Sequence, residues 1–321
     1  MTQNTNPHKN VNAFLNDPTA TKSKNDPIDE ETLSILLLKH GYQLQNKIGS
    51  GGFATCYTVR SQKYNKIYVA KTSRINRDAS KMLCTNNEAT LHPESVVAEI
   101  ESLIHIVHTN VIQIFDYFIE QDSYFFIILE YCTGGSIQDF VKNHGPLPLP
   151  KLIEYSKTIL LALKDIHALN IAHKDIKPAN ILIDAFGRPK LADFGLAQHT
   201  GSSHLDFRVG GSYQFLSPEY FKALSAYKST KNRAELRKVD PFISDIWALG
   251  ITFYFMATGH LPFVADTKNE LQKMIVNGLI IYPEHIHPRY KELLTAMLIT
   301  YPEKRLTIDK LLKMKIFAAN P

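Results

Sequence analysis

Eight consecutive positions, from His173 to Asn180, bring together one acid, two lysines and one amide. The acid is Asp175, the amide is Asn180, and an apolar run follows at once. A second acid, Asp193, comes thirteen residues after Asn180, in the tripeptide Asp-Phe-Gly. Magnesium prefers hard oxygen ligands and is usually held by one or two carboxylates together with substrate phosphates. These residue types therefore suit chemistry on a polyphosphate that carries magnesium.

A second cluster, nearer the N-terminus, is rich in glycine. Glycines in a tight turn let backbone N–H groups approach phosphate oxygens closely. By itself such a cluster is often only a hairpin turn, but a strand-like run that ends in Lys71 follows about twenty residues later. The turn and the lysine together indicate a phosphate site. The cluster consists of Ile48, Gly49, Ser50, Gly51, Gly52, Phe53 and Ala54.

The two clusters together resemble the signatures of the protein kinases. The first is similar to the catalytic loop, His-Arg-Asp-x-x-x-x-Asn, followed by Asp-Phe-Gly, with Lys174 in place of the arginine. The second is similar to the Gly-rich loop and the phosphate-binding lysine, with Ala54 in place of the third glycine. Gly-Gly-Phe-Ala followed by Cys-Tyr looks like the loop of polo-like kinases. The resemblance covers about residues 42 to 317.

The resemblance implies an α+β, bilobal fold, with a small β-rich N-lobe that has one main helix and a larger, mostly helical C-lobe. We expect the N-lobe at residues 41–131 and the C-lobe at residues 132–321. Residues 1–40 are expected to be a tail that ends in a short helix. We expect disorder to about residue 27, because so few large apolar residues cannot offset the entropy of ordering the chain.

By resemblance, the ligands are ATP, Mg²⁺ and protein substrates. The backbone of Gly49–Ala54 is expected to cover the phosphates of ATP, and Lys71, oriented by Glu99, to bind the α- and β-phosphates. Glu99 is preferred to neighbouring glutamates because it lies nine residues before His108, in a predicted helix over about residues 94–107. The alternative for Glu99 is a solvated surface glutamate.

The continuous apolar run from Tyr124 to Leu129 predicts a buried strand. By resemblance, this strand leads into the hinge between the lobes, where Leu129 is the gatekeeper and the backbone of Glu130 and Cys132 hydrogen-bonds adenine. The expected nucleotide-binding residues are therefore Ile48, Gly49, Ser50, Gly51, Gly52, Phe53, Ala54, Lys71, Leu129, Glu130 and Cys132.

The resemblance also assigns catalytic roles. Asp175 is expected to orient a substrate hydroxyl and accept its proton, and Lys177 to stabilise the transferring phosphoryl group. Asn180 and Asp193 are expected to hold Mg²⁺. Lys177 at the second position after Asp175 is the pattern of serine/threonine kinases, and Ser212 stands where that group has a threonine that bridges these two residues. The resemblance therefore implies an ATP-dependent serine/threonine protein kinase.

Several elements must position these residues. An amphipathic helix over residues 151–169 delivers the chain to the catalytic loop. A helix that opens at Asp245 is apolar on every side and is therefore expected to be buried. By resemblance, Asp245 steadies the backbone of the catalytic loop, and Glu219, in Ser-Pro-Glu, forms a structural pair with Arg305.

Two segments have more than one interpretation. Acids ahead of an apolar run predict a short helix over about residues 29–41, which we expect to dock on the following domain rather than bind a partner. Residues 222–238 look like an insertion in the family pattern and are expected to be an exposed loop, with a docking patch for acidic substrates as the alternative. Against one acid they hold Lys222, Lys228, Lys231, Arg233, Arg237 and Lys238.

The activation segment departs from the pattern of kinases that its phosphorylation switches on. Those kinases generally have an arginine before the catalytic acid, which forks onto the phosphate of a threonine. Lys174 is a single-point cation here, and Arg208 stands where that threonine usually is. We therefore expect activity without phosphorylation of this segment. The alternative is a shifted loop in which Ser202 or Ser203 carries the phosphate.

Composition narrows the function further. The net charge of +5, without a zinc-finger or similar motif, does not indicate a nucleic-acid partner. Cys56, Cys84 and Cys132 are widely spaced and odd in number, which fits a reducing, intracellular compartment. The N-terminus lacks an apolar signal segment, and the longest uncharged stretch, 246–265, is interrupted by glycine and proline, so we expect a buried helix and no membrane span. We expect a monomer.

Two alternatives to a protein kinase stay open. A pseudokinase would bind or scaffold with an inactive site, although the expected residues for metal, phosphate and proton transfer are all present. A small-molecule kinase of related fold would share the catalytic loop but would generally lack Ser-Pro-Glu and the helix signature at 245–250.

Overall fold

The computed structural model describes residues 28–50, 54–74, 104, 106–120, 124–194, 198–199, 212–232 and 234–318 of the 321-residue chain. Most of the helix expected at 94–107, including Glu99, lies outside the described residues. The same holds for Gly51, Gly52 and Phe53 of the Gly-rich loop, and for the activation-segment residues 200–211.

The first half of the described chain builds a five-stranded antiparallel sheet in the order β1-β2-β3-β5-β4. Its runs are rich in β-branched and aromatic residues, which favour a pleated, half-buried surface. The predicted buried strand over 124–129 is confirmed as β5. The strands are β1 (Tyr42–Ser50), β2 (Ala54–Ser61), β3 (Ile67–Arg74), β4 (Ile114–Glu120) and β5 (Tyr124–Glu130).

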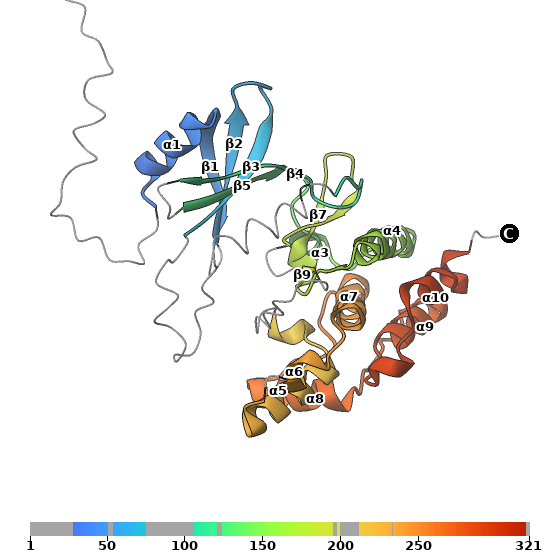
Figure 1. The fold of residues 1–321 in the computed structure, drawn as a ribbon. Helices are drawn as coiled ribbons and strands as arrows, with labels where there is room; N and C mark the ends of the chain where they lie inside the picture. The colour runs from blue at the N-terminus through green and yellow to red at the C-terminus, as the bar shows by residue number, and fades with distance from the viewer. Residues whose placement is uncertain are drawn as a thin grey trace, which may run out of the picture.

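Helix α1 (Glu30–Lys39) lies against this sheet, on the side away from the helical remainder of the molecule (Figure 1). Asp29 caps the helix, because its Oδ1 accepts a hydrogen bond from the backbone N–H of Thr32 at 2.8 Å. The predicted docking of this helix is confirmed. Its buried face, Leu33, Leu36 and Leu37, shares a core cluster with the sheet residues Tyr57, Val59, Tyr68, Ala70, Phe118, Phe126 and Ile128.

The pleat of β3 places Lys71 on the other face of the sheet. Side chains along a strand alternate between the two faces, so Tyr68 and Ala70, which pack in the α1 cluster, lie opposite to Lys71. Lys71 pairs in register with Cys56 on β2 and with Ile127 on β5. A central strand, paired on both sides, therefore carries this lysine.

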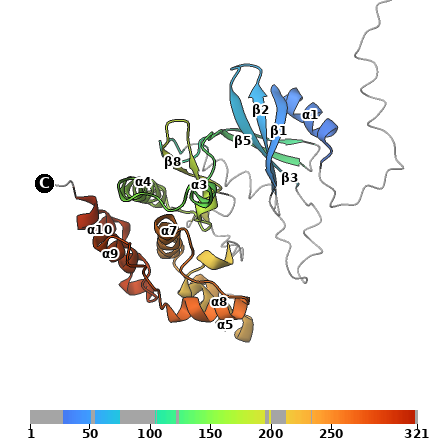
Figure 2. The same cartoon turned by 180° about the vertical axis from the view of Figure 1, so that it is seen from behind.

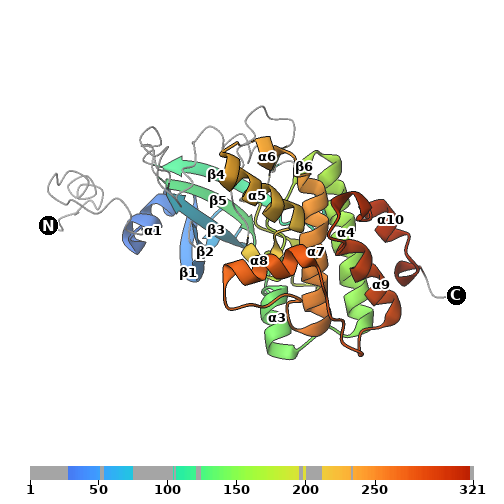
Figure 3. The ribbon, with the colours of Figure 1, turned by 90° about the horizontal axis from the view of Figure 1, so that it is seen from below.

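The rest of the described chain is mostly helical, as Figures 2 and 3 show from two further directions. At its centre, α7 is buried from Asp245 to Thr258, as its all-round apolar pattern predicts. Among the described residues, no helix is long and apolar enough to cross a membrane. The helices are α3 (Ile137–His144), α4 (Leu149–Ala168), α5 (Pro218–Thr230), α6 (Ala234–Arg237), α7 (Pro241–Thr258), α8 (Lys268–Asn277), α9 (Pro288–Met297) and α10 (Ile308–Leu312).

The expected catalytic residues lie on or beside short strands and 3₁₀ turns. Two small antiparallel sheets form here, one from β6 and β9 and the other from β7 and β8. They position the loop between β6 and β7 and the start of the Asp-Phe-Gly segment after β8. The elements are β6 (Ile171–Ala172), β7 (Ile181–Ile183), β8 (Pro189–Leu191), β9 (Gln198–His199) and the 3₁₀ turns η4 (Pro178–Asn180), η5 (Tyr213–Phe215), η6 (Pro302–Lys304) and η7 (Lys315–Phe317).

The expectation of an exposed loop at 222–238 is wrong. Helix α5 continues to Thr230, ends at Lys231 in the left-handed conformation (φ 55°), and is followed by the short helix α6. Phe221 and Leu236 are buried, and they hold the two helices against the body of the protein. Among the described basic residues, Lys222 and Lys228 of α5 and Arg237 of α6 are exposed.

The docking of α1 gives a stability prediction. Leu37→Ala should lower the free energy of unfolding by ~2–5 kcal/mol, because it leaves a cavity in a fully buried site. Ile35→Ala, on the same helix but 52% exposed, should change it by at most about 0.5 kcal/mol. Urea titration of both variants makes the comparison. Equal effects of the two substitutions would contradict the docking of α1 through its Leu33–Leu37 face.

Candidate active site

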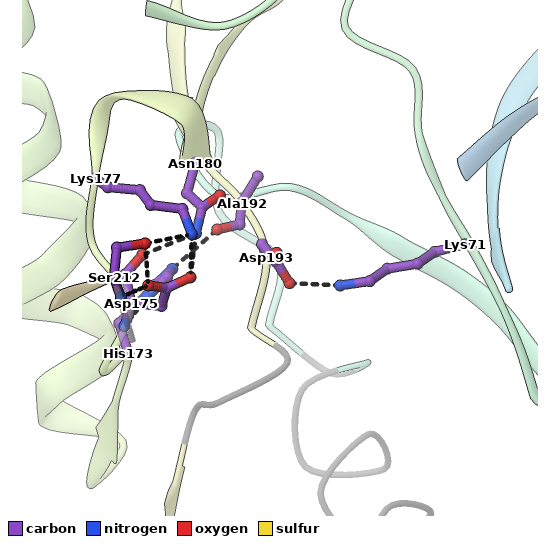
Figure 4. Close-up of polar contacts among 8 residues, drawn as sticks. All are labelled: Lys71, His173, Asp175, Lys177, Asn180, Ala192, Asp193 and Ser212. Carbon is purple, nitrogen blue, oxygen red and sulfur yellow. Dashed lines mark hydrogen bonds and ion pairs between the residues drawn. The ribbon is translucent and has the colours of Figure 1, made fainter. Parts of the chain in front are cut away.

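Asp175 lies at the centre of a hydrogen-bonded cluster of side chains (Figure 4). Its Oδ2 accepts hydrogen bonds from Lys177 Nζ at 2.6 Å and from Asn180 Nδ2 at 3.0 Å. Its Oδ1 accepts one from the backbone N–H of Ser212 at 3.1 Å, and Lys177 Nζ also donates to Ser212 Oγ at 3.0 Å. The sequence-based expectation that Ser212 bridges the acid and the lysine is therefore confirmed.

The buried carboxylate of Asp245, in the first turns of α7, fixes the backbone of the loop that carries Asp175. Asp245 accepts hydrogen bonds from the backbone N–H groups of His173 and Lys174, both at 2.8 Å. It also contacts His167 Nε2 of α4 at 2.9 Å. Lys174 has a φ of 67°, a left-handed conformation that costs a non-glycine residue energy and persists where its surroundings enforce it. The expected role of Asp245 in steadying this backbone is confirmed.

His173 is fully buried directly beneath the cluster. Burial lowers the pKa of its imidazole, so the neutral ring is favoured. A neutral imidazole has one donor and one acceptor nitrogen. Nδ1 can accept from the backbone N–H of Asp175 at 3.3 Å, and Nε2 can donate to the carbonyl of Ala192 at 3.0 Å. The ring thus ties the loop of Asp175 to the strand that leads into Asp193.

Asp193 completes the site from the end of that strand. The backbone N–H of Ala192 donates to the carbonyl of Asn180 at 2.8 Å, which fixes the spacing of the two expected metal ligands. Asp193 has a φ of 62° and contacts Lys71 Nζ through Oδ1 at 2.5 Å. Figure 4 shows Lys71 reaching this carboxylate from the sheet, on the side opposite to the Asp175 cluster. The structure therefore brings Lys71, Asp175, Lys177, Asn180 and Asp193 into one site.

The described residues of the Gly-rich loop lie where β1 ends and β2 begins. Ile48, Gly49 and Ser50 end β1, Ala54 begins β2, and Ser50 pairs with Thr55. The remaining residues of the loop, and Glu99, cannot be placed because they lie outside the described residues.

The expected hinge connects β5 to α3. The backbone N–H of Glu130 donates to the carbonyl of Gln113 at 2.9 Å, so this N–H is not free to donate to a nucleotide base. Within the described part of the chain, no hydrogen bond uses the backbone N–H of Cys132. Burial raises the pKa of the Cys132 thiol to about 12, and its side chain belongs to an apolar cluster that Leu129 contacts.

Sequence analysis missed one residue of the site. Cys56 lies directly opposite Lys71 in the register of β2 and β3, and burial raises the pKa of its thiol. The charges of Lys71 and Asp193 also act on the pKa of this thiol, as its place beside Lys71 in the sheet leads one to expect. The pairing of β2 with β3 is the signal that could have revealed this contact. Which residue lies opposite Lys71, however, depends on the register of the two strands, which the length of the turn between them sets.

The expected ion pair between Arg305 and Glu219 is present and largely buried. Arg305 Nη1 and Nη2 donate to Glu219 Oε1 and Oε2 at 2.8 and 3.0 Å, in the bidentate geometry that arginine favours. Arg305 also donates to the carbonyls of Ile243 and Ile299. The segment that follows Ser212 is thereby joined to the start of α7.

Comparison with known proteins agrees with this arrangement. The family model described as "Protein kinase domain" matches residues 42–317. The chain is 31% identical over 269 residues to the serine/threonine-protein kinase ULK3 of Xenopus laevis, which covers 82% of this chain and 52% of the relative. It is 31% identical over 229 residues to the probable serine/threonine-protein kinase HSL1 of Saccharomyces cerevisiae, covering 71% and 14% of the two chains.

A third relative, an Aurora kinase of Dictyostelium discoideum, is 28% identical over 268 residues, which are 83% of this chain and 63% of the relative. The chain thus spans about half or less of the first two of these relatives. The finer likeness of the Gly-rich loop to polo-like kinases stays a prediction. Because the family model covers most of the chain, this chain belongs to the protein kinase family, with its bilobal α+β fold.

Proposed function

We propose that the protein transfers the γ-phosphoryl group of ATP to serine and threonine hydroxyls of protein substrates. The observation that carries this proposal is the cluster of Asp175, Lys177, Asn180 and Ser212, which lies beside the Lys71–Asp193 pair. Phosphoryl transfer relies on positioning and on charge stabilisation more than on covalent catalysis. Asp175, Asp193 and the lysines Lys71 and Lys177 supply the positioning and the charge stabilisation, because the contacts given above fix each side chain.

Asp175 is the proposed acceptor of the substrate's proton. Its carboxylate is oriented from three sides, by Lys177, Asn180 and the backbone of Ser212, so the oxygen that meets the hydroxyl is fixed before the substrate arrives. Lys177 lies 2.6 Å from that carboxylate and is proposed to stabilise negative charge on the transferring group.

The donors around Asn180 and Asp193 fit Mg²⁺. The hydrogen bonds of the Asn180 side chain within the described residues use its amide nitrogen, so the amide oxygen faces no competing donor there. An amide oxygen and a carboxylate are hard ligands, and magnesium normally completes its shell with phosphate oxygens and water. Bound magnesium would neutralise charge on the phosphates. Lys71 is proposed to bind the α- and β-phosphates, with Glu99 as its partner.

For the nucleotide itself, we propose the loop from Ile48 to Ala54 and the hinge residues Leu129, Glu130 and Cys132. The backbone N–H of Cys132, which no hydrogen bond uses within the described residues, supports this assignment. We also place the boundary between the lobes at residues 131 and 132, between β5 and α3, with an N-terminal segment at 1–40.

The preference for serine and threonine rests on two observations. Lys177 reaches both Asp175 and Ser212, which is the arrangement implied by the serine/threonine pattern. The relatives reported above carry serine/threonine-protein kinase or Aurora kinase names.

The first test compares three synthetic peptides that differ only in a serine, threonine or tyrosine acceptor, incubated with Mg²⁺ and ATP. Phosphate should appear on the serine and threonine peptides. Asp175→Asn should lower kcat by ~10²–10⁴-fold, because it removes the group that accepts the proton, while ATP affinity stays nearly unchanged. Asp309→Asn, an identical substitution at an exposed site on α10, is the control. Unchanged turnover in Asp175→Asn would reject the assigned role, and no transfer by the wild type would favour a pseudokinase.

A second test concerns the metal. Mg²⁺ should no longer tighten ATP binding in Asp193→Ala, because the carboxylate that would hold the metal is lost. Lys71→Met is the matched variant: it should weaken ATP binding both with and without Mg²⁺. Calorimetric titration of ATP into each variant measures both effects. If Asp193→Ala keeps the wild-type dependence on Mg²⁺, the metal is held elsewhere.

A further inference from the structure

A hollow of about 310 Å³ lies where the sheet meets the helical part of the protein, and Glu130 of the expected hinge is one of its lining residues. The start of β3, the beginning of β4, the hinge and the turn between β7 and β8 all contribute to it. Tyr68, which packs in the α1 cluster, lines it together with its neighbour Ile67. Its lining residues are Lys66, Ile67, Tyr68, Phe115, Glu130, Tyr131, Asp184, Ala185, Phe186 and Arg188.

Its walls present aromatic rings to solvent. Phe186 is 82% exposed, Phe115 is 44% exposed, and Phe115 packs edge-on against Tyr68 with ring centroids 4.9 Å apart. Tyr131 adds a third partly exposed ring. Single exposed apolar residues are ordinary, but several exposed rings around one hollow are typical of an interaction site.

The most exposed ring is held in place by its own turn. Asp184, itself buried, accepts hydrogen bonds from the backbone N–H of Phe186 at 2.8 Å and from Nε of Arg188 at 2.8 Å. The carbonyl of Gly187 accepts a hydrogen bond from Tyr155 of α4 at 2.6 Å. The Arg188 guanidinium then lies 4.9 Å from the Phe186 ring. Such fixed contacts pre-organise Phe186, which lowers the entropic cost of binding to it.

The hollow also carries an excess of positive charge. Glu130 is paired with Lys190 at 2.9 Å, and Asp184 with Arg188 at 2.7 Å, so these charges compensate each other. Lys66 is different: its ammonium lies 5.8 Å from the Tyr68 ring and 5.9 Å from the Phe115 ring, and in the described part of the chain it forms no ion pair. A cation over aromatic rings at the rim would complement a carboxylate.

We propose that this hollow binds a peptide segment of a partner protein that has an aromatic or branched aliphatic anchor next to an aspartate or glutamate. The anchor packs between Phe115 and Phe186, and the carboxylate meets Lys66. A ring-lined pocket with a charged rim matches the usual division of a peptide interface into an apolar anchor and polar edges. The walls are too exposed to enclose a small cofactor, which would normally lose most of its surface to the pocket.

The experiment selects ligands from a random twelve-residue peptide library displayed on phage, with the full chain as bait. The enriched peptide is then synthesised with fluorescein, and its binding is measured by anisotropy. The enriched family should contain an apolar anchor beside an acid. Phe186→Ser should weaken its binding by about tenfold or more. Lys66→Glu should weaken it and flatten its dependence on salt.

Charge reversal and matched controls sharpen the result. A peptide whose acid is replaced by lysine should bind Lys66→Glu better than it binds the wild type. Leu279→Ser removes an equally exposed apolar side chain from another surface, and Lys157→Glu reverses an exposed charge on α4; both should bind as the wild type does. ATP affinity, measured in parallel, should be the same in all variants, which separates this proposal from the function of the active site.

Several outcomes would overturn the proposal. These are a library that yields no enriched family, peptides that lack acids, and equal binding by Phe186→Ser and wild type. Binding that tightens several-fold when residues 1–27 are deleted would assign the hollow to the chain's own N-terminal segment and not to a partner. A dimer in analytical ultracentrifugation that Phe186→Ser abolishes would assign it to a second copy.

Discussion

One buried carboxylate sets the geometry on which the active site depends. Asp245 begins the buried part of α7 and accepts hydrogen bonds from two consecutive backbone N–H groups, those of His173 and Lys174. These bonds are charge-assisted and lie where water is excluded, so they are stronger than neutral bonds at a surface. They hold Lys174 in a left-handed conformation, which turns the chain so that Asp175 faces Lys177, Asn180 and Ser212. The position of the proposed proton acceptor thus follows from the burial of a helix.

The other half of the site comes from the sheet. Lys71 is fixed by its place on a central strand and meets Asp193, whose own loop is tied through Ala192 to Asn180 and His173. The proposed polyphosphate site is therefore built from two parts of the molecule that are connected by the segment between β5 and α3. The same connection lines the hollow, where Glu130 and Tyr131 lie beside Phe115 and Phe186. An occupant of that hollow would touch both parts of the molecule, and Glu130 is common to the hollow and to the proposed nucleotide site.

Motifs and periodicity predicted much of this arrangement. The Asp245 contacts, the Arg305–Glu219 pair, the buried strand β5 and the docking of α1 were all expected, because each depends on local pattern or on a family signature. The interpretation of 222–238 failed because it rested on charge, whereas α5 begins before this segment at Pro218 and the buried Leu236 packs the short helix α6. Cys56 and the hollow were missed for a different reason. The first depends on strand register, and the second joins four segments that are distant in sequence.

The central claim is that Asp245 acts on catalysis by placing Asp175, and a double-mutant cycle on kcat tests it most directly. Asp245→Asn keeps the shape of the side chain but turns a donor toward backbone N–H groups, so kcat should fall by at least about tenfold. Residues that act as one unit are not additive. The account therefore predicts that Asp175→Asn combined with Asp245→Asn is no slower than Asp175→Asn alone. Losses that multiply in the double variant would show that Asp245 acts independently, through stability or another group, and would contradict the account.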